Sequence, residues 1–215
     1  MSALTPERLL AILHFQTEIA KARLDLGEVI AAAMAHATEH AHMVEEADAL
    51  YRQATRDSLT GLANRALFYD RLHQALALAR RQKHPLGIAL LDMDGLKQIN
   101  DLHGHRAGDE ALCTLASRLQ GATRDSDTVA RLGGDEFGIL LPNVQDRKAA
   151  LEVAEKVTQQ VEGPFEFEGQ AFPLHASLGL ALFPEEGLDA EGLLQLADGR
   201  MYAAKRVHKG LAGPT

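Results

Sequence analysis

Four acidic residues in the middle of the chain have types and spacing that could do chemistry. Asp92 and Asp94 follow the apolar run LGIALL, and Asp135 and Glu136 follow two glycines in the stretch RLGGDEFGIL. Two carboxylates that lie close together repel each other unless a cation lies between them. Hard oxygen ligands on a rigid sheet edge suit Mg²⁺, which completes its shell with water and phosphate. The backbone carbonyl of Met93 could supply a third ligand.

The strands around these acids decide whether they can meet. The run 86–91 is continuously apolar, which predicts a buried central strand, and residues 127–142 predict a hairpin that Pro142 stops. If the hairpin pairs beside the central strand, Asp92 and Asp135 emerge at the same end of the sheet. The structural alternative is that Asp92 merely ends a strand and Asp135 merely occupies a turn.

The remaining pattern predicts helices that alternate with a mostly hairpin-connected sheet. Such an order is typical of α+β folds, in which helices cover one or both faces of the sheet. A tripeptide, Glu168-Gly169-Gln170, joins two further strands in the region 164–183. Helical periodicity is found over the ranges 5–56, 62–82, 97–120 with a break at 103–108, 146–161 and 188–207.

The first 55 residues predict a helical dimerisation and regulatory segment, and residues 56–215 a second domain. Thr5 and Pro6 form a helix start. Steps of three and four residues, the spacing of a coiled-coil seam, separate the apolar-stripe residues Leu26, Ile30, Ala33, Ala37, His40, Val44, Ala47, Tyr51 and Ala54. One or two helices packed on the body of the protein are the alternative.

His36, His40 and His42 in this segment raise the possibility of zinc, because histidines at i and i+4 share a helix face. Without a cysteine or a third well-placed ligand beyond Glu39, a surface or seam position is favoured.

Composition limits the classes of partner. The chain has 215 residues, of which 46% are hydrophobic, and a net charge of -8. An acidic protein is a poor general binder of nucleic acid, and an anionic ligand would need a metal ion or backbone amides to offset repulsion. The single cysteine, Cys113, excludes a disulfide framework. We expect no signal peptide, no membrane span and a cytoplasmic location.

Four motifs together resemble the GGDEF-domain diguanylate cyclases. They are DSLTGLANR (57–65), DMDGLKQINDLHGHRAGD (92–109), RLGGDEF (131–137) and ADGRMYAAK (197–205). They occur in the order and at the spacing of that family, over roughly residues 56–210. The joint match is specific, whereas a lone GGDEF string would only be suggestive.

The resemblance implies a palm-like α+β fold similar to the class III nucleotide cyclases, with a central, mostly antiparallel sheet flanked by helices. It also implies that a homodimer converts two GTP molecules into cyclic di-GMP and two pyrophosphates, with Mg²⁺ or Mn²⁺. Asp92, the Met93 carbonyl and Asp135 would bind the metal. Asp135, as proton acceptor, and Glu136 would be the catalytic residues.

By the same resemblance, Asn100 and Asp109 would read the guanine edge and His105 would line the nucleotide site. Asp109 can accept from the N1–H and 2-amino groups of guanine, so ATP should be rejected. Free amides of the turn that opens a helix at Gly95 would hold the β- and γ-phosphates. The implied contacts to the nucleotide further include Leu96, Lys97, Gly133, Gly134, Lys205 and Lys209. Lys97 and Lys205 as solvated helix residues, and His105 as a capping or packing residue, are the structural alternatives.

The sequence departs from the family pattern after Lys205. The family usually continues with two residues and then Gly-Arg, whereas this chain has His208 and Lys209 at those places. Lysine keeps the charge of arginine but loses its bidentate fork, so we expect weaker triphosphate affinity with activity retained.

Arg124 and Asp127 form an R-x-x-D pattern that resembles the product-inhibition site of the family, where cyclic di-GMP is gripped. A polar loop is the alternative interpretation of this pattern.

Two other functions compete with the enzyme. The chain could be a catalytically silent receptor for GTP or cyclic di-GMP, although the GGDEF tip and Asp92 are intact. It could also be a purely structural dimerisation protein, but this function would leave the carboxylates, Asn100 and Asp109 unexplained.

Overall fold

The computed structural model describes residues 6–211, apart from the side chains of Arg8, Leu9, Ile12, Lys209 and Leu211. The predicted cap Thr5 therefore lies outside the described part. Contacts divide the chain into two compact units, Met1–Arg52 and Gln53–Thr215.

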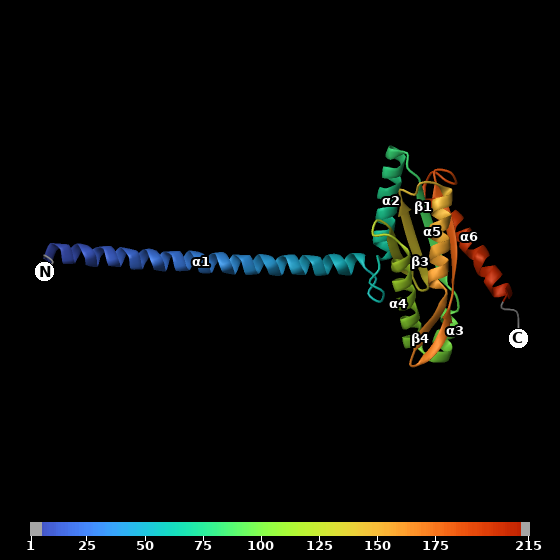
Figure 1. Cartoon of the computed structure of the whole chain (residues 1–215), viewed down its shortest axis with the longest axis horizontal. Coiled ribbons are helices and arrows are strands. Elements are labelled where there is room, and N and C mark those ends of the chain that lie inside the picture. The colour runs from blue at the N-terminus through green and yellow to red at the C-terminus, as the bar shows by residue number, and fades with distance from the viewer. Residues whose placement is uncertain (1–5, 212–215) are drawn as a thin grey trace. The chain divides into compact units, whose positions relative to one another are not determined.

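Helix α1, Pro6–Thr55, is one unbroken helix of 50 residues (Figure 1). Its sequence has no proline after Pro6 and is rich in alanine, the residue with the highest helix propensity. Every described side chain from Pro6 to Ala54 is exposed, including Ile30 and Val44 of the apolar stripe. Helices of this length with an uncovered stripe are typical of coiled coils.

The second unit contains a four-stranded sheet and a separate hairpin. The order of the sheet is β2-β3-β1-β6, and all of its pairings are antiparallel. The hairpin pairs β4 with β5. The remaining elements of this unit and their bounds are α2 Arg65–Gln82, β1 Leu86–Met93, α3 Leu96–His103, α4 His105–Ala122, β2 Thr128–Gly133, β3 Glu136–Pro142, α5 Arg147–Val161, β4 Gly163–Phe167, β5 Gln170–Leu174, β6 Ala176–Phe183 and α6 Ala190–Leu211.

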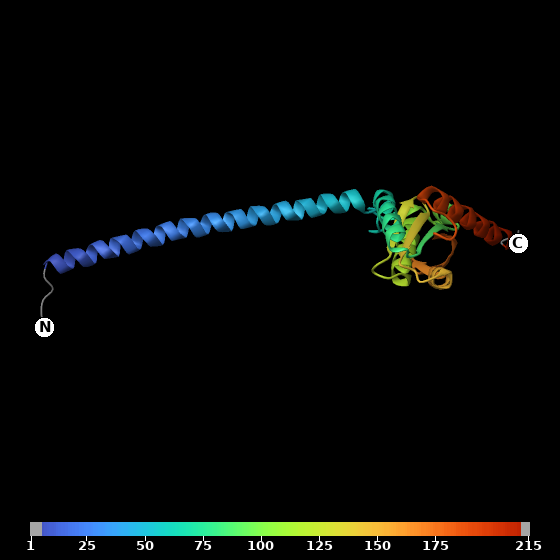
Figure 2. The ribbon, with the colours of Figure 1, turned by 90° about the horizontal axis from the view of Figure 1, so that it is seen from above.

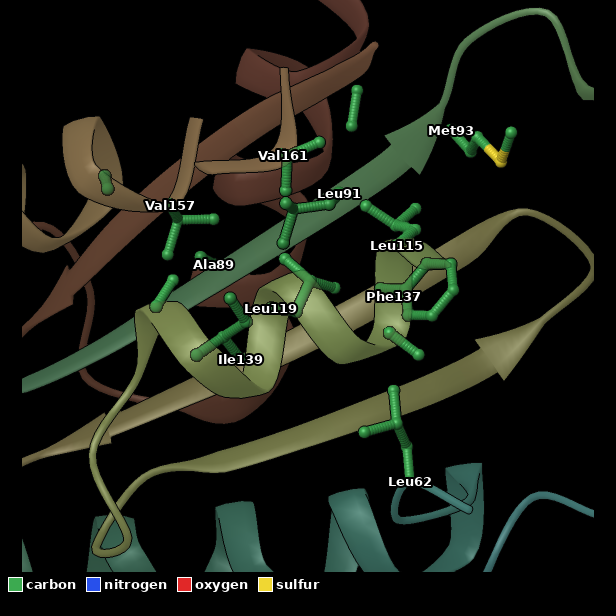
Figure 3. Close-up of a cluster of buried hydrophobic side chains, with 14 of the residues drawn as sticks. Leu62, Ala89, Leu91, Met93, Leu115, Leu119, Phe137, Ile139, Val157 and Val161 are labelled. Atoms are coloured by element: carbon green, nitrogen blue, oxygen red, sulfur yellow. The ribbon is translucent and has the colours of Figure 1, made fainter. Parts of the chain in front are cut away.

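Helices cover both faces of the sheet, and each face has its own buried cluster. Helices α4 and α5 pack on one face, where Ala89, Leu91 and Phe137 lie in the core (Figure 3). Helices α2 and α6 lie on the other face, over Ile88 and Leu140 (Figure 2). Alternate residues of β1 therefore enter opposite clusters, as the two-residue period of a strand requires. The predicted α+β architecture is confirmed.

Several predicted boundaries were wrong. Helix α2 begins at Arg65 rather than at residue 62, because the Asn64 side chain accepts a hydrogen bond from the Leu67 amide and caps the helix. Helix α6 begins at Ala190, after the Asp189 side chain, and continues to Leu211 rather than ending at 207. The break between α3 and α4 is confined to Gly104.

None of the helices in the described part of the chain is both long and apolar enough to span a membrane.

Candidate active site

One end of the sheet carries both the end of β1 and the β2–β3 turn. Asp92 lies opposite Glu136 of β3 and opposite Ser177 of β6. The amide of Met93 donates a 3.0 Å hydrogen bond to the carbonyl of Asp135. This hydrogen bond joins the end of β1 to the hairpin tip, and it brings Asp92, Met93 and Asp135 to one end of the sheet.

The hairpin tip depends on two glycines with positive φ. The values are +146° at Gly133 and +55° at Gly134, a conformation that side chains with a Cβ rarely adopt. No atom lies within 4 Å of where a Cβ would be at either position. Glycine is therefore needed here for the positive φ angles and not to avoid a steric clash, and the space beside the tip is open to a ligand.

Arg131 holds this tip in place, a role that the sequence analysis did not assign. Its guanidinium donates to the carbonyl of Gly134 through Nε and Nη2, at 3.0 and 2.8 Å. It also donates to Asp57 Oδ1 at 3.2 Å, and both side chains are largely buried. Burial alone would raise the pKa of Asp57, but hydrogen bonds from Thr60 and the charge of Arg131 lower it. The motif around Asp57 and the GGDEF tip therefore form one structural unit.

Asp92 lies among more negative than positive charge. Only 8% of the residue is exposed, and its Oδ1 is hydrogen-bonded to Lys205 Nζ of α6. Burial, together with the charges of Asp135 and Asp94, raises the pKa of Asp92 more than Lys205 lowers it. Burial would lower the pKa of Lys205, but its hydrogen bond to Asp92 and the three carboxylates raise it. Lys205 is thus hydrogen-bonded to Asp92 and lies in the field of Asp94 and Asp135.

Asp94 is the first residue after β1, and like Asp92 it contacts a side chain of α6. Its Oδ2 accepts from Ser177 Oγ at 2.9 Å and lies 3.2 Å from His208 Nδ1. Its Oδ1 is buried and has no hydrogen-bond partner among the described residues. His208, which stands where the family pattern has glycine, is therefore in direct contact with the acidic cluster.

The predicted phosphate turn has the expected shape. Gly95 has φ +80° and caps α3, whose first residue is Leu96. Lys97 is exposed in the first turn of that helix. A helix start with free amides and a nearby cation can hold an anion.

The predicted guanine readers lie at the junction of α3 and α4. Asn100 is on α3, and its Oδ1 is buried without a partner among the residues described. Gly108 of α4 lies so close that a Cβ there would be 2.0 Å from that oxygen. Asp109, the next residue, is exposed, as is His105 at the start of α4. The structure thus brings Asn100 next to the helix that carries Asp109.

Glu136 shares the sheet face of Asp92 but has a different neighbourhood. Its side chain is exposed and lines a cavity of about 260 Å³ between α2 and α6, together with Tyr69 and Asp198. Neither Asp92 nor Asn100 lines this cavity.

Arg124 and Asp127 form a closed local turn. Asp127 Oδ2 accepts a 2.9 Å hydrogen bond from the Arg124 amide, and the Asp127 amide donates to the Arg124 carbonyl. The Arg124 residue itself is exposed. The Asp127 carboxylate therefore stabilises the turn, and Arg124 is exposed on that turn. The Lys209 side chain lies outside the described residues.

The chemistry of the donor set fits a hard divalent cation. The Met93 amide is bound to the Asp135 carbonyl, and the charges of Asp135 and Asp94 raise the pKa of Asp92. Carboxylate and backbone carbonyl oxygens are ligands that suit Mg²⁺. Within residues 6–211, no three His, Cys, Asp or Glu side chains gather into a metal site by themselves. The predicted set, which uses a carbonyl as its third ligand, does not need such a group.

Comparison with known proteins identifies relatives. The family model described as "Diguanylate cyclase, GGDEF domain" matches residues 54–210. Diguanylate cyclase TpbB of Pseudomonas aeruginosa is 40% identical over 171 residues, which cover 79% of this chain and 39% of TpbB. The chain therefore spans about two fifths of that relative.

Two solved structures match the fold. The GGDEF domain of TpbB has a TM-score of 0.68 and 41% identity, and the match covers 70% of this chain and 88% of that one. The coiled coil and GGDEF domain of DgcB from Caulobacter crescentus, in complex with c-di-GMP, has a TM-score of 0.72 and 29% identity, over 82% and 94% of the two chains. By its sequence motifs, its fold and these matches, the chain belongs to the GGDEF-domain family of diguanylate cyclases.

Proposed function

We propose that the chain is a diguanylate cyclase that condenses two GTP molecules into cyclic di-GMP and two pyrophosphates. The observation that carries this proposal is the position of Asp92, Met93 and Asp135 at one end of the sheet, where Lys205 is hydrogen-bonded to Asp92 and the neighbouring acids raise the pKa of Asp92. The relatives that share this domain and are named diguanylate cyclases support it.

The residues at this end of the sheet would have separate roles in the reaction. Mg²⁺ bound by Asp92, the Met93 carbonyl and Asp135 would neutralise phosphate oxygens and lower the pKa of the attacking 3′-hydroxyl. Asp135 accepts the proton of that hydroxyl as its oxygen bonds to the α-phosphorus of the second GTP and pyrophosphate leaves. Lys205, already held by Asp92, offsets charge on the leaving phosphates.

The α3–α4 junction would select guanine. Asn100 Oδ1 is buried with no partner among the described residues, and Asp109 adds an exposed carboxylate. Donors on the guanine edge satisfy both acceptors, whereas adenine lacks the 2-amino group. Unpaired buried polar groups are costly, so ATP is rejected.

The product joins two nucleotides, so two half-sites must face each other. Each 3′-hydroxyl attacks the other nucleotide, which requires two copies of the domain related by a two-fold axis. The uncovered apolar stripe of α1 supplies a pairing surface that raises the local concentration of the domains.

Turnover of purified protein with GTP and Mg²⁺, with nucleotides resolved by chromatography, tests the proposal. We expect cyclic di-GMP and pyrophosphate, and a loss of at least about a hundredfold in Asp135→Asn. Asp70→Asn, a change on the exposed surface of α2, is the matched control and should keep full turnover. Tight GTP binding by the wild type without cyclic product would identify a receptor and reject the enzyme.

Product inhibition through Arg124 is a finer proposal. The exposed guanidinium on a fixed turn suits stacking on guanine and pairing with phosphate. We expect Arg124→Ala to turn over GTP normally but to lose inhibition by added cyclic di-GMP, while Arg81→Ala remains inhibited. Unchanged inhibition in Arg124→Ala would count against the assignment.

A further inference from the structure

The final turns of α6 meet the sheet at the candidate active site. Gly179 of β6 permits close approach earlier in the helix, since a Cβ there would lie 2.0 Å from the Ala197 carbonyl oxygen. Beyond Met201, most described side chains are exposed, including Tyr202 and Val207. Among the described side chains of this part of α6, Lys205 and His208 are hydrogen-bonded to the end of β1 and to the residue that follows it.

Two side chains three apart on α6 contact two acids at the end of β1. Lys205 is hydrogen-bonded to Asp92 of β1, and His208 lies against Asp94, the first residue after the strand. Between the two acids lies Met93, whose backbone also binds the hairpin tip.

The contact of His208 is directional. Its Nδ1 lies 3.2 Å from Asp94 Oδ2 and 3.3 Å from Ser177 Oγ, and Ser177 donates to the same carboxylate oxygen. In a hydrogen bond between Nδ1 and a carboxylate oxygen, the N–H donates and the oxygen accepts. Asp94 is further fixed by its amide, which donates to the His175 carbonyl at 2.9 Å. Helix α6, β6 and the end of β1 therefore meet at one carboxylate.

Asp94 is also the first residue of the turn that opens α3. We infer that His208 is a positioning residue, which holds Asp94 and thereby fixes the phosphate-binding turn 94–97 before nucleotide arrives. The phosphate role of this turn rests on the proposed function, whereas the contact itself does not. His208, which stands where the family pattern has glycine, thus adds a side-chain hydrogen bond to this turn.

The expected consequence is a change in substrate binding rather than in chemistry. His208 fixes the turn before nucleotide arrives, so loosening the turn weakens the binding of the triphosphate and is expected mainly to raise KM. For His208→Ala we expect KM for GTP to rise about three- to tenfold and kcat to stay within about twofold. Asparagine places its amide nitrogen near the position of Nδ1, so His208→Asn should restore most of the affinity.

A second readout does not depend on turnover. In the full-length chain without nucleotide, amide hydrogen exchange of the peptide covering residues 93–99 should be about fivefold faster in His208→Ala and near normal in His208→Asn. Val207→Ala, an exposed neighbour, should leave both exchange and kinetics unchanged. If exchange at 93–99 is the same in His208→Ala as in the wild type, the inference is overturned. A wild type that makes no cyclic product would reject the proposed function, and the exchange result would still decide the role of His208.

Discussion

At the scale of single residues, the geometry around Asn100 is the most informative. Its side-chain oxygen is buried with no hydrogen-bond partner in the described part of the chain, although such atoms are nearly always paired. Glycine at position 108 makes room for that oxygen. An acceptor held ready in this way suits a ligand that brings its own donor.

Gly108→Ala should displace Asn100 without unfolding the protein. The new Cβ would lie 2.0 Å from Oδ1 and 2.9 Å from Cγ, so the amide must rotate away. We expect KM for GTP to rise about tenfold, which corresponds to about 1.4 kcal/mol, and discrimination against ATP to fall. Steady-state kinetics with both nucleotides measure these effects.

Gly121→Ala on the same helix is the matched control, because the nearest atom to its Cβ, Gln160 Oε1, is 3.8 Å away. It should keep wild-type kinetics and gain up to about 1 kcal/mol of stability from helix propensity. Equal kinetics in the two alanine variants would argue against a nucleotide role for Asn100.

At the scale of elements, one carboxylate ties three of them together. Glu186 follows β6 and accepts from Arg200 of α6 at 2.8 Å through each of its oxygens, and from Arg147 of α5 at 2.7 Å. The Leu182 amide also donates to it. These hydrogen bonds outweigh burial and lower the pKa of Glu186 to about 2. The position of α6, and with it Lys205 and His208, depends on this network.

Glu186 makes stability depend on pH in a defined window. Its folded-state pKa lies below the ordinary 4.5, so its contribution is complete above about pH 4.5 and is lost as pH falls toward 2. We expect the free energy of unfolding of Glu186→Gln to be about 2 kcal/mol lower than that of the wild type at pH 7. Solvent screening of part of the network limits the loss to this size, and the difference should shrink below pH 4.

Urea denaturation at several pH values measures this difference. Glu185→Gln is the control, because Glu185 is 57% exposed and touches only the rim of the network. A Glu186→Gln deficit that stays constant between pH 7 and 3 would show that the carboxylate charge is not the cause.

At the scale of the whole molecule, α1 presents an apolar stripe that its own chain leaves exposed. Leu26, Ile30, Val44 and Tyr51 of that stripe are each about half exposed or more. Burial against a second copy of the helix would remove this surface from water, with Ala47 in the seam and Ala49 facing outward.

A pair of identical substitutions tests the coiled coil. We expect Ala47→Glu to shift the protein toward monomer at micromolar concentration and to make turnover per chain fall with dilution, because charge at the seam must be desolvated. Ala49→Glu should remain dimeric with normal turnover. Sedimentation and activity across a dilution series measure both, and a dimeric, fully active Ala47→Glu variant would remove the coiled coil from the mechanism.

Much of the architecture follows from local pattern. The apolar run 86–91 predicted the central strand, and the two glycines before Asp135 predicted the hairpin, because strand period and turn chemistry act over a few residues. Helix ends were less well predicted. Asn64 and Asp189 cap the starts of α2 and α6. Several neighbouring polar residues could also have capped these helices, so the sequence alone did not identify the first helical residue.

The sequence by itself determined that acids end a strand and occupy a hairpin tip, and that a long helix carries an apolar stripe. Only the tertiary structure decided which side chain contacts which acid: Lys205 contacts Asp92, His208 contacts Asp94 and Arg131 contacts Asp57. These partners are 113, 114 and 74 positions apart in the chain. No local period links residues at such separations, because their contact depends on how α6 and the hairpin pack against the rest of the fold.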